Sequence, residues 1–124
     1  VLRGLHFQGK PFEQAKLVSV PQGSIKDVVV DIRKDSPTYG QWKAFAINSK
    51  EKNVLFVPEG FAHGFLALED SIVSYGTTAH YNKESESGII WNDPTLKIDW
   101  EISNPILSEK DRKFPSFEEI SHFL

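Results

Sequence analysis

The chain has 124 residues and a formal net charge of -3, from 14 Lys plus Arg against 17 Asp plus Glu. No basic patch for nucleic acid is therefore expected, and an anionic ligand must be held by a few placed cations. The lack of cysteine excludes disulfides, thiolate metal sites and a cysteine nucleophile. No apolar run approaches the roughly 20 residues that span a bilayer. The composition predicts one cytoplasmic domain over residues 1–124, with no membrane or nucleic-acid partner.

The N-terminal stretch VLRGLHFQ has the alternation of an extended strand. In such a strand Arg3, Leu5 and Phe7 share one face, and His6 lies on the other face beside a glycine. Two interpretations stay open from these residues alone. His6 is either a hydrogen-bonded histidine of a half-buried edge strand or a histidine directed at a site.

Short runs rich in Val, Ile, Phe and Thr recur between turn signals along the next 70 or so residues. They cover residues 15–20, 24–33, 41–48, 54–58, 63–69 and 71–81. Their spacing is typical of consecutive strands in a sandwich or barrel rather than of alternating strands and helices. The sequence therefore predicts an all-β fold.

The run over residues 24–33 has one mostly aliphatic face and one face with two carboxylates. Asp27 and Asp31 alternate with Ile25 and Val29. If this face points into a barrel, each carboxylate needs a partner.

The C-terminal stretch SFEEISHFL, residues 116–124, has the pattern of a short helix. Ser116 can cap it, and Glu119 stands where a capping box requires it, ahead of the apolar residues Ile120, Phe123 and Leu124. His122 in this helix is expected to be a surface residue.

His63 follows a proline and glycine turn in VPEGFAHGFL and enters an apolar strand. An unpaired ring nitrogen would be costly there. It is therefore either a core histidine bonded to the backbone or a carboxylate, or part of a site.

The spacing P-E-G-F-A-H at residues 58–63 resembles the second motif of the cupin superfamily, whose barrels often hold a metal. The region of the first motif has no His-x-His pair, only Asp27 and Asp31. Zinc or iron needs three or four donors, so we expect a cupin-type jelly roll that works without a metal. There is also no G-x-S-x-G elbow, no P-loop and no G-x-G-x-x-G.

Five segments together resemble the dTDP-4-dehydrorhamnose 3,5-epimerase family, in order and over nearly the whole chain. These are VLRGLHFQ, QAKLVSVPQGSIKDVVVDIRKDSPTYGQW, VPEGFAHGFLALED, YGTTAHYNKESESGIIWNDPTLKIDW and LSEKDRKFP. The resemblance implies a cupin-type jelly roll, a homodimer and no cofactor. It also implies a dTDP-4-keto-6-deoxy sugar as substrate, inverted at carbons 3 and 5.

The same resemblance implies four catalytic residues. His6 would be the base, Asp111 the carboxylate that orients its ring, Lys16 the cation near the 4-keto oxygen and Tyr75 the acid across the sugar. The residues alone leave plainer roles open: Asp111 as a surface acid, Lys16 as a lysine reaching solvent, and Tyr75 as a core or rim aromatic.

For substrate binding, the resemblance implies Arg3 and Lys110 at the diphosphate and Tyr81 stacked on the thymine ring. It implies Glu86 as a ligand-contacting carboxylate and His63 in the substrate pocket. Arg3 could instead form a structural ion pair with Asp27 or Asp31.

Two departures from the family bear on function. Members usually begin with a further N-terminal segment, so we expect a truncated chain or a shortened homologue. Gly76 stands where many members have lysine, and it could move Tyr75. Two alternatives therefore stay open: a 3-epimerase that acts on carbon 3 alone, and a nucleotide-sugar-binding cupin without catalysis.

Overall fold

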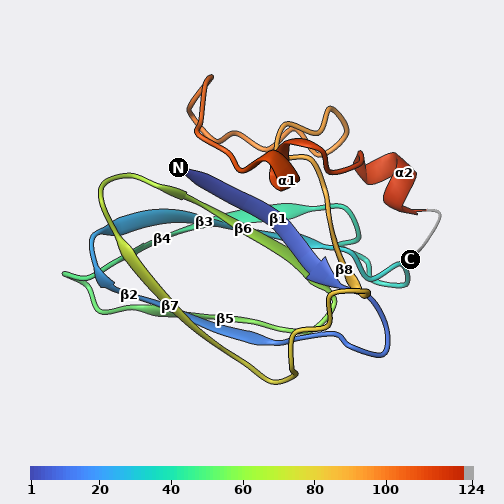
Figure 1. Ribbon diagram of the computed structural model, residues 1–124, viewed down its shortest axis with the longest axis horizontal. Helices are drawn as coiled ribbons and strands as arrows, with labels where there is room; N and C mark the ends of the chain where they lie inside the picture. Colours follow the sequence, from blue (N-terminus) through green and yellow to red (C-terminus); the bar gives the residue numbers. More distant parts are fainter. Residues whose placement is uncertain (122–124) are drawn as a thin grey trace.

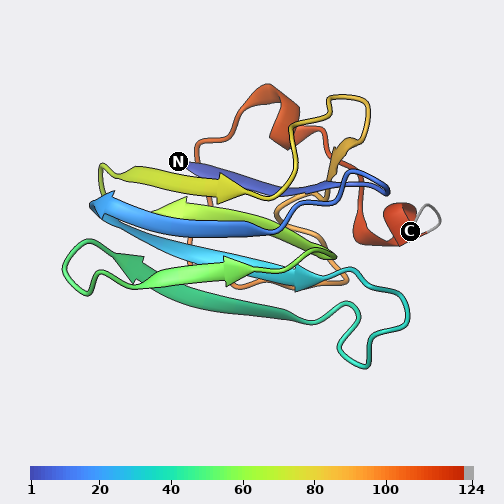
Figure 2. The same ribbon diagram turned by 90° about the horizontal axis from the view of Figure 1, so that it is seen from below.

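In the computed structural model, residues 1–121 are described, and their eight strands form two antiparallel sheets that face each other (Figures 1 and 2). The larger sheet has the order β4-β3-β6-β1-β8, and the smaller sheet has the order β5-β2-β7. The strands are β1 (Leu2–Gln8), β2 (Lys16–Gln22), β3 (Ser24–Asp31), β4 (Trp42–Asn48), β5 (Val54–Val57), β6 (Phe61–Ala67), β7 (Ile72–Thr77) and β8 (Glu86–Gly88). The predicted all-β architecture is confirmed.

Each predicted run overlaps one of these strands; β2 ends two residues after its run, and β6 begins two residues before its run. β8 was not predicted, because its three residues, ESG, carry no apolar alternation. It exists because it pairs with β1, where Gly88 lies opposite His6 and Glu86 opposite Gln8.

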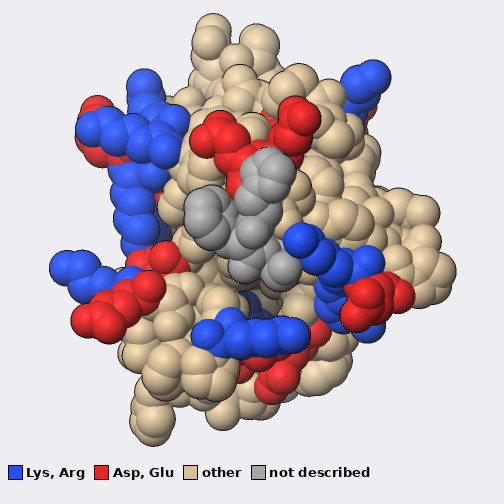
Figure 3. Space-filling view, turned by 90° about the vertical axis from the view of Figure 1, so that its right-hand side faces the viewer, with Lys and Arg blue, Asp and Glu red and all other residues tan. Residues whose placement is uncertain are grey.

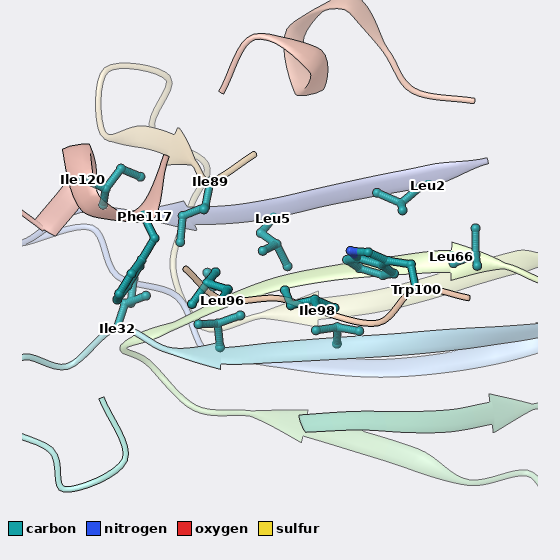
Figure 4. Packing of buried hydrophobic residues seen from close by; sticks show 13 residues of the cluster. Leu2, Leu5, Ile32, Leu66, Ile89, Leu96, Ile98, Trp100, Phe117 and Ile120 are labelled. Carbon is teal, nitrogen blue, oxygen red and sulfur yellow. The ribbon is translucent and has the colours of Figure 1, made fainter. Parts of the chain in front are cut away.

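Apolar side chains fill two separate layers. Between the sheets lies a cluster formed by Val18, Val20, Ile25, Ile47 and Val57. On the outer face of the larger sheet, β1 and β3 pack against the chain that follows β8, which contributes Leu96, Ile98, Trp100, Phe117 and Ile120 (Figure 4). The larger sheet is therefore covered on both faces, whereas the smaller sheet is covered on its inner face.

The two faces of β3 separate as predicted. Val28 and Val30 face the outer layer, and Ile25 faces the inner one. The two carboxylates are buried and both have partners: Asp27 binds His63, and Asp31 binds Arg33.

The predicted alternation along β1 is wrong. Its register shifts between Arg3 and His6, so Leu2 and Leu5 both enter the outer core while Arg3 and His6 both line the cleft described below. Gly4 makes this possible with a φ of +130°, and a Cβ there would lie 2.6 Å from the Cα of Gly64. Only glycine tolerates that backbone shape and that approach.

Two short helices follow the strands, α1 (Glu109–Arg112) and α2 (Phe117–Ser121). At α2 the predicted capping box is confirmed, because the Ser116 hydroxyl accepts from the Glu119 N–H at 3.2 Å and the Glu119 carboxylate accepts from the Ser116 N–H at 3.4 Å. His122, Phe123 and Leu124 lie outside the described residues. Neither helix is long and apolar enough to cross a membrane.

Candidate active site

A cleft of about 1670 Å³ opens at one end of the two sheets, beside α1. Strands β1, β2 and β7 line it together with the segments around residues 9–14, 81–87 and 106–111. All four residues predicted to be catalytic reach it, as do four of the five predicted to bind substrate; these are His6, Lys16, Tyr75, Asp111, Arg3, Tyr81, Glu86 and Lys110. Folding brings these positions together from widely separated parts of the chain.

His6 and Asp111 form a hydrogen-bonded pair although 105 residues separate them. The His6 Nε2 lies 2.8 Å from the Asp111 Oδ1, and the edge of the ring packs against Phe114. The Asp111 side chain is 5% exposed and that of His6 is 32% exposed. Within residues 1–121 the His6 Nδ1 has no hydrogen-bond partner, so this nitrogen can take up a proton from a molecule in the cleft.

Asp111 is held by two further hydrogen bonds. Its N–H donates to the Ser108 hydroxyl that caps α1, at 3.1 Å, and its Oδ2 accepts from the Gly4 N–H at 3.2 Å. The shift in β1 therefore serves both members of the pair, since it turns His6 toward the cleft and supplies a donor to Asp111. From sequence, Asp111 has the features of a surface acid, but the structure shows it buried.

Lys16 enters the cleft from the first position of β2. Burial lowers the pKa of Lys16, and the negative charges of Asp27 and Glu86 partly offset this effect. Its Nζ lies 5.9 Å from the centre of the Tyr75 ring. Tyr75 is 56% exposed and faces the cleft from β7, so a cation and a phenol share one side of the cleft.

Glu86, Tyr81 and Lys110 form a second cluster in the cleft. The Tyr81 hydroxyl donates to the Glu86 Oε2, and the Lys110 ammonium contacts the same oxygen, each at 2.5 Å. Burial alone would raise the pKa of Glu86, but these two donors lower it. The hydrogen bond to Glu86 raises the pKa of Lys110, which therefore carries its charge beside Asp111.

Arg3 is exposed and lines the cleft. The alternative ion pair is not formed: Arg3 has no salt bridge to Asp27 or Asp31, which pair with His63 and Arg33. Acidic and basic side chains are intermixed on the face seen in Figure 3, and no uniform basic patch covers that face.

His63 is the one predicted site residue that does not line the cleft. Its side chain is 6% exposed, and its Nε2 lies 2.8 Å from the Asp27 Oδ2. This agrees with the interpretation of a core histidine bonded to a carboxylate. Its contact with substrate stays a prediction.

Gln8 is a site residue that the sequence analysis did not single out. Its amide donates to the Phe12 carbonyl at 2.6 Å and accepts from the Asn82 N–H at 2.9 Å, so it ties together two loops that border the cleft. Its only signal in the sequence is a polar side chain at the end of β1.

Among residues 1–121, no three His, Asp or Glu side chains are grouped as a metal site would need.

Residues 1–119 match the family model described as dTDP-4-dehydrorhamnose 3,5-epimerase. A protein of that name from Methanothermobacter thermautotrophicus is 51% identical, with 96% of this chain and 66% of the relative covered, and one from Shigella flexneri is 45% identical over 100% and 69%. The chain thus spans about two thirds of the length of these relatives.

A crystal structure of dTDP-6-deoxy-D-glucose-3,5-epimerase from Legionella pneumophila, in complex with dTDP-4-keto-L-rhamnose, superimposes on this chain with a TM-score of 0.92. It is 42% identical to this chain, with 98% of this chain and 65% of that one covered. Such agreement in fold confirms the predicted cupin-type jelly roll. This chain belongs to the dTDP-4-dehydrorhamnose 3,5-epimerase family of isomerases.

Proposed function

We propose that this chain epimerises carbons 3 and 5 of dTDP-4-dehydro-6-deoxyglucose by moving protons next to the 4-keto group. The observation that carries the proposal is the His6–Asp111 pair, open to a cleft that Lys16 and Tyr75 also enter. Inverting a carbon beside a ketone requires a base, a group that stabilises the enolate and an acid on the opposite face. The cleft supplies one candidate for each role.

His6 is the proposed base. The carboxylate of Asp111 accepts from Nε2, orients the ring and stabilises the imidazolium that forms when Nδ1 takes the proton. The Lys16 ammonium offsets the negative charge that develops on the 4-keto oxygen. Tyr75 then donates its hydroxyl proton to the carbon from the other face. The His6 imidazolium loses its proton to solvent and the Tyr75 phenolate takes one up, which restores the starting protonation of the protein.

The nucleotide would be held at the same end of the cleft. Arg3 is one of the exposed cations that line the cleft, and it forms no ion pair within residues 1–121, so it is available to a diphosphate. Lys110 can serve the same anion if it leaves Glu86. Tyr81, at 62% exposed, offers a face for the thymine ring.

The first test follows proton exchange in deuterated water. Proton NMR of dTDP-4-dehydro-6-deoxyglucose with the protein should show loss of the signals at carbons 3 and 5. His6→Asn should slow exchange at both carbons by at least about 100-fold, because general-base catalysis is lost. The matched control is His80→Asn, since His80 is exposed and does not line the cleft.

Exchange at carbon 3 alone would replace the proposal with a 3-epimerase. A bound sugar with no exchange at either carbon would contradict catalysis and favour a sugar-binding role. Equal rates in His6→Asn and the parent would remove His6 as the base.

Tyr75→Phe separates the acid from the base. Removing the phenol proton should slow net inversion by about 100-fold while proton removal at carbon 3 is affected less. Deuterium incorporation and product formation are followed in the same sample. Equal loss of both rates would argue against Tyr75 as the acid.

A homodimer completes the proposal. The outer face of β5-β2-β7 carries Leu17, Val54, Phe56 and Ile72, each more than half exposed. A contiguous apolar sheet face of this kind favours burial against a partner, and a second copy presents the same face.

The cytoplasmic location and the single-domain organisation stay predictions of the sequence.

A further inference from the structure

Gln8 carries the one buried side-chain amide among the described residues, and backbone groups bind it on both its donor and its acceptor side. It ends β1 and is 8% exposed. Its Nε2 donates to the Phe12 carbonyl at 2.6 Å and to the His80 carbonyl at 3.4 Å, and its Oε1 accepts from the Asn82 N–H at 2.9 Å. Two acceptors and one donor around it fix the orientation of the amide. Both N–H groups of the side chain are therefore used within the protein.

Two of these three partners are the immediate neighbours of Tyr81 in the chain. The His80 carbonyl precedes Tyr81 and the Asn82 N–H follows it, so one amide holds the backbone on both sides of this residue. The far end of the Tyr81 side chain is held as well, because its hydroxyl donates to the Glu86 Oε2 at 2.5 Å. Gln8 and Glu86 lie opposite each other in the ladder between β1 and β8. A facing pair of strand residues therefore holds Tyr81 at its backbone and at its hydroxyl.

Tyr81 is held at both ends although most of its surface is open to solvent. The residue is 62% exposed and lines the cleft. An exposed aromatic side chain on a loop ordinarily keeps conformational freedom that a ligand must remove when it binds. Fixing the side chain in advance lowers that cost, which is the advantage of a preorganised site. The contacts therefore indicate a ring that is held for a ligand rather than for packing.

Other hydrogen bonds between the same two segments lie farther from Tyr81. The Gly9 N–H donates to the Ser85 carbonyl at 2.8 Å, and the Gln14 side-chain amide donates to the Ala79 carbonyl at 2.7 Å. These bonds join the segments but do not involve the residues on either side of Tyr81. The Gln8 side chain is thus the contact that acts directly beside Tyr81.

We propose that Gln8 is a positioning residue that holds the Tyr81 ring as a fixed platform for the thymine ring of the nucleotide. The inference rests on the proposed function and deepens it, because Tyr81 is the residue assigned there to the thymine ring. Gln8 acts through the backbone of its partners, and Tyr81 makes the contact with the ligand. Without Gln8, the nucleotide itself would have to order the loop around Tyr81, at the expense of affinity.

The experiment replaces Gln8 with methionine, Gln8→Met, which keeps a side chain of similar length and removes all three hydrogen bonds. Calorimetry measures the dissociation constant of dTDP, and proton NMR in deuterated water gives KM and kcat for proton exchange in the sugar nucleotide. The dissociation constant and KM should both rise about 3- to 10-fold, because binding must now order Tyr81. The value of kcat should stay within about twofold, because the loss is the same in the ground state and the transition state.

Two further variants separate positioning from a general structural role. Tyr81→Ala should itself weaken dTDP, and adding Gln8→Met to it should change the dissociation constant less than about twofold, because no ring is left to position. A general structural role would weaken dTDP equally in both backgrounds. Gln14→Met is the matched control, since it removes one hydrogen bond between the same segments, at Ala79. It should weaken dTDP less than about twofold.

Amide hydrogen exchange of the ligand-free protein measures the positioning directly. In the parent, the Asn82 N–H should exchange at least about tenfold more slowly than that of Lys83, the exposed residue next to it. Gln8→Met should remove most of this protection. If Gln8→Met does not fold, the parent decides: slower exchange at Asn82 supports the inference, and equal exchange at Asn82 and Lys83 overturns it.

An unchanged dTDP affinity in folded Gln8→Met, while Tyr81→Ala weakens dTDP, would overturn the inference alone. Equal weakening by Gln8→Met in the Tyr81→Ala background, or by Gln14→Met in the parent, would overturn it as well. An unchanged affinity in Tyr81→Ala would contradict both the assignment of Tyr81 in the proposed function and the inference that rests on it. Calorimetry and amide exchange need no turnover. Failure of proton exchange at carbons 3 and 5 would therefore contradict epimerisation without changing these results.

Discussion

At the scale of single residues, Gly4 determines the positions of two site residues, His6 and Asp111. Its φ of +130° turns β1 so that Leu5 enters the core and His6 faces the cleft, and its N–H binds Asp111. Gly76 differs, because a Cβ built there meets nothing within 4 Å and its backbone is extended. Gly76 therefore imposes no comparable constraint on the neighbouring Tyr75.

Gly4→Ala is expected to lower the free energy of unfolding by about 2–4 kcal/mol, through positive φ and a clash with the backbone of Gly64. The matched variant Gly76→Ala should be neutral or raise stability by about 0.5 kcal/mol. Urea unfolding of the three proteins checks this. Equal stability of Gly4→Ala and the parent would show that β1 does not need this backbone shape.

At the scale of elements, the loop from β3 to β4 depends on the last residue of β3. The Asp31 carboxylate accepts from the Arg33 N–H and guanidinium and from the hydroxyls of Ser36 and Thr38. Burial would raise the pKa of Asp31, but these donors hold it well below its ordinary value. The charged carboxylate therefore stabilises the folded state.

Asp31→Asn should lower the free energy of unfolding by on the order of 2 kcal/mol at pH 7. Because the folded pKa is depressed, this contribution is complete above about pH 5 and is lost as the pH falls through 4 toward the folded pKa of Asp31. In urea unfolding, the difference in free energy of unfolding between variant and parent should thus be smaller at pH 3 than at pH 7. Asp35→Asn, an exposed acid of the same loop, should show no gap at either pH. A gap that does not change with pH would contradict an ionised Asp31.

At the scale of the whole molecule, the two sheets are covered unequally. The chain after β8 covers the outer face of the larger sheet, and no described segment covers the apolar outer face of β5-β2-β7. Phe56, at 58% exposed, lies opposite Leu17 in the ladder and contributes to this face. In a two-fold interface, each copy would present its Phe56 to the other.

Phe56→Glu should raise the dissociation constant of the dimer by at least about tenfold, because it introduces a charge at an apolar contact in both copies. Sedimentation or light scattering over a concentration series measures it. Ile102→Glu changes an exposed isoleucine of the C-terminal segment and should leave the dimer intact. Equal dissociation in both variants, or a monomeric parent, would contradict the proposed interface.

Patterns that act over a few residues could be predicted from the sequence. Alternation along β3 separates its apolar face from Asp27 and Asp31, and Ser116 with Glu119 begins α2, because such preferences depend on neighbours within one strand or turn. The resemblance to known epimerases added the positions of the site. The residues alone left Asp111 as a surface acid and Lys16 as a lysine at solvent.

Only the tertiary structure decided how these positions meet. His6 reaches Asp111 across 105 residues, β8 forms because β1 is beside it, and β1 departs from simple alternation where Gly4 approaches Gly64. His63 lies behind the cleft because Asp27 on the neighbouring strand binds it. Each of these outcomes depends on contacts between distant segments, and no local preference of the chain contains that information.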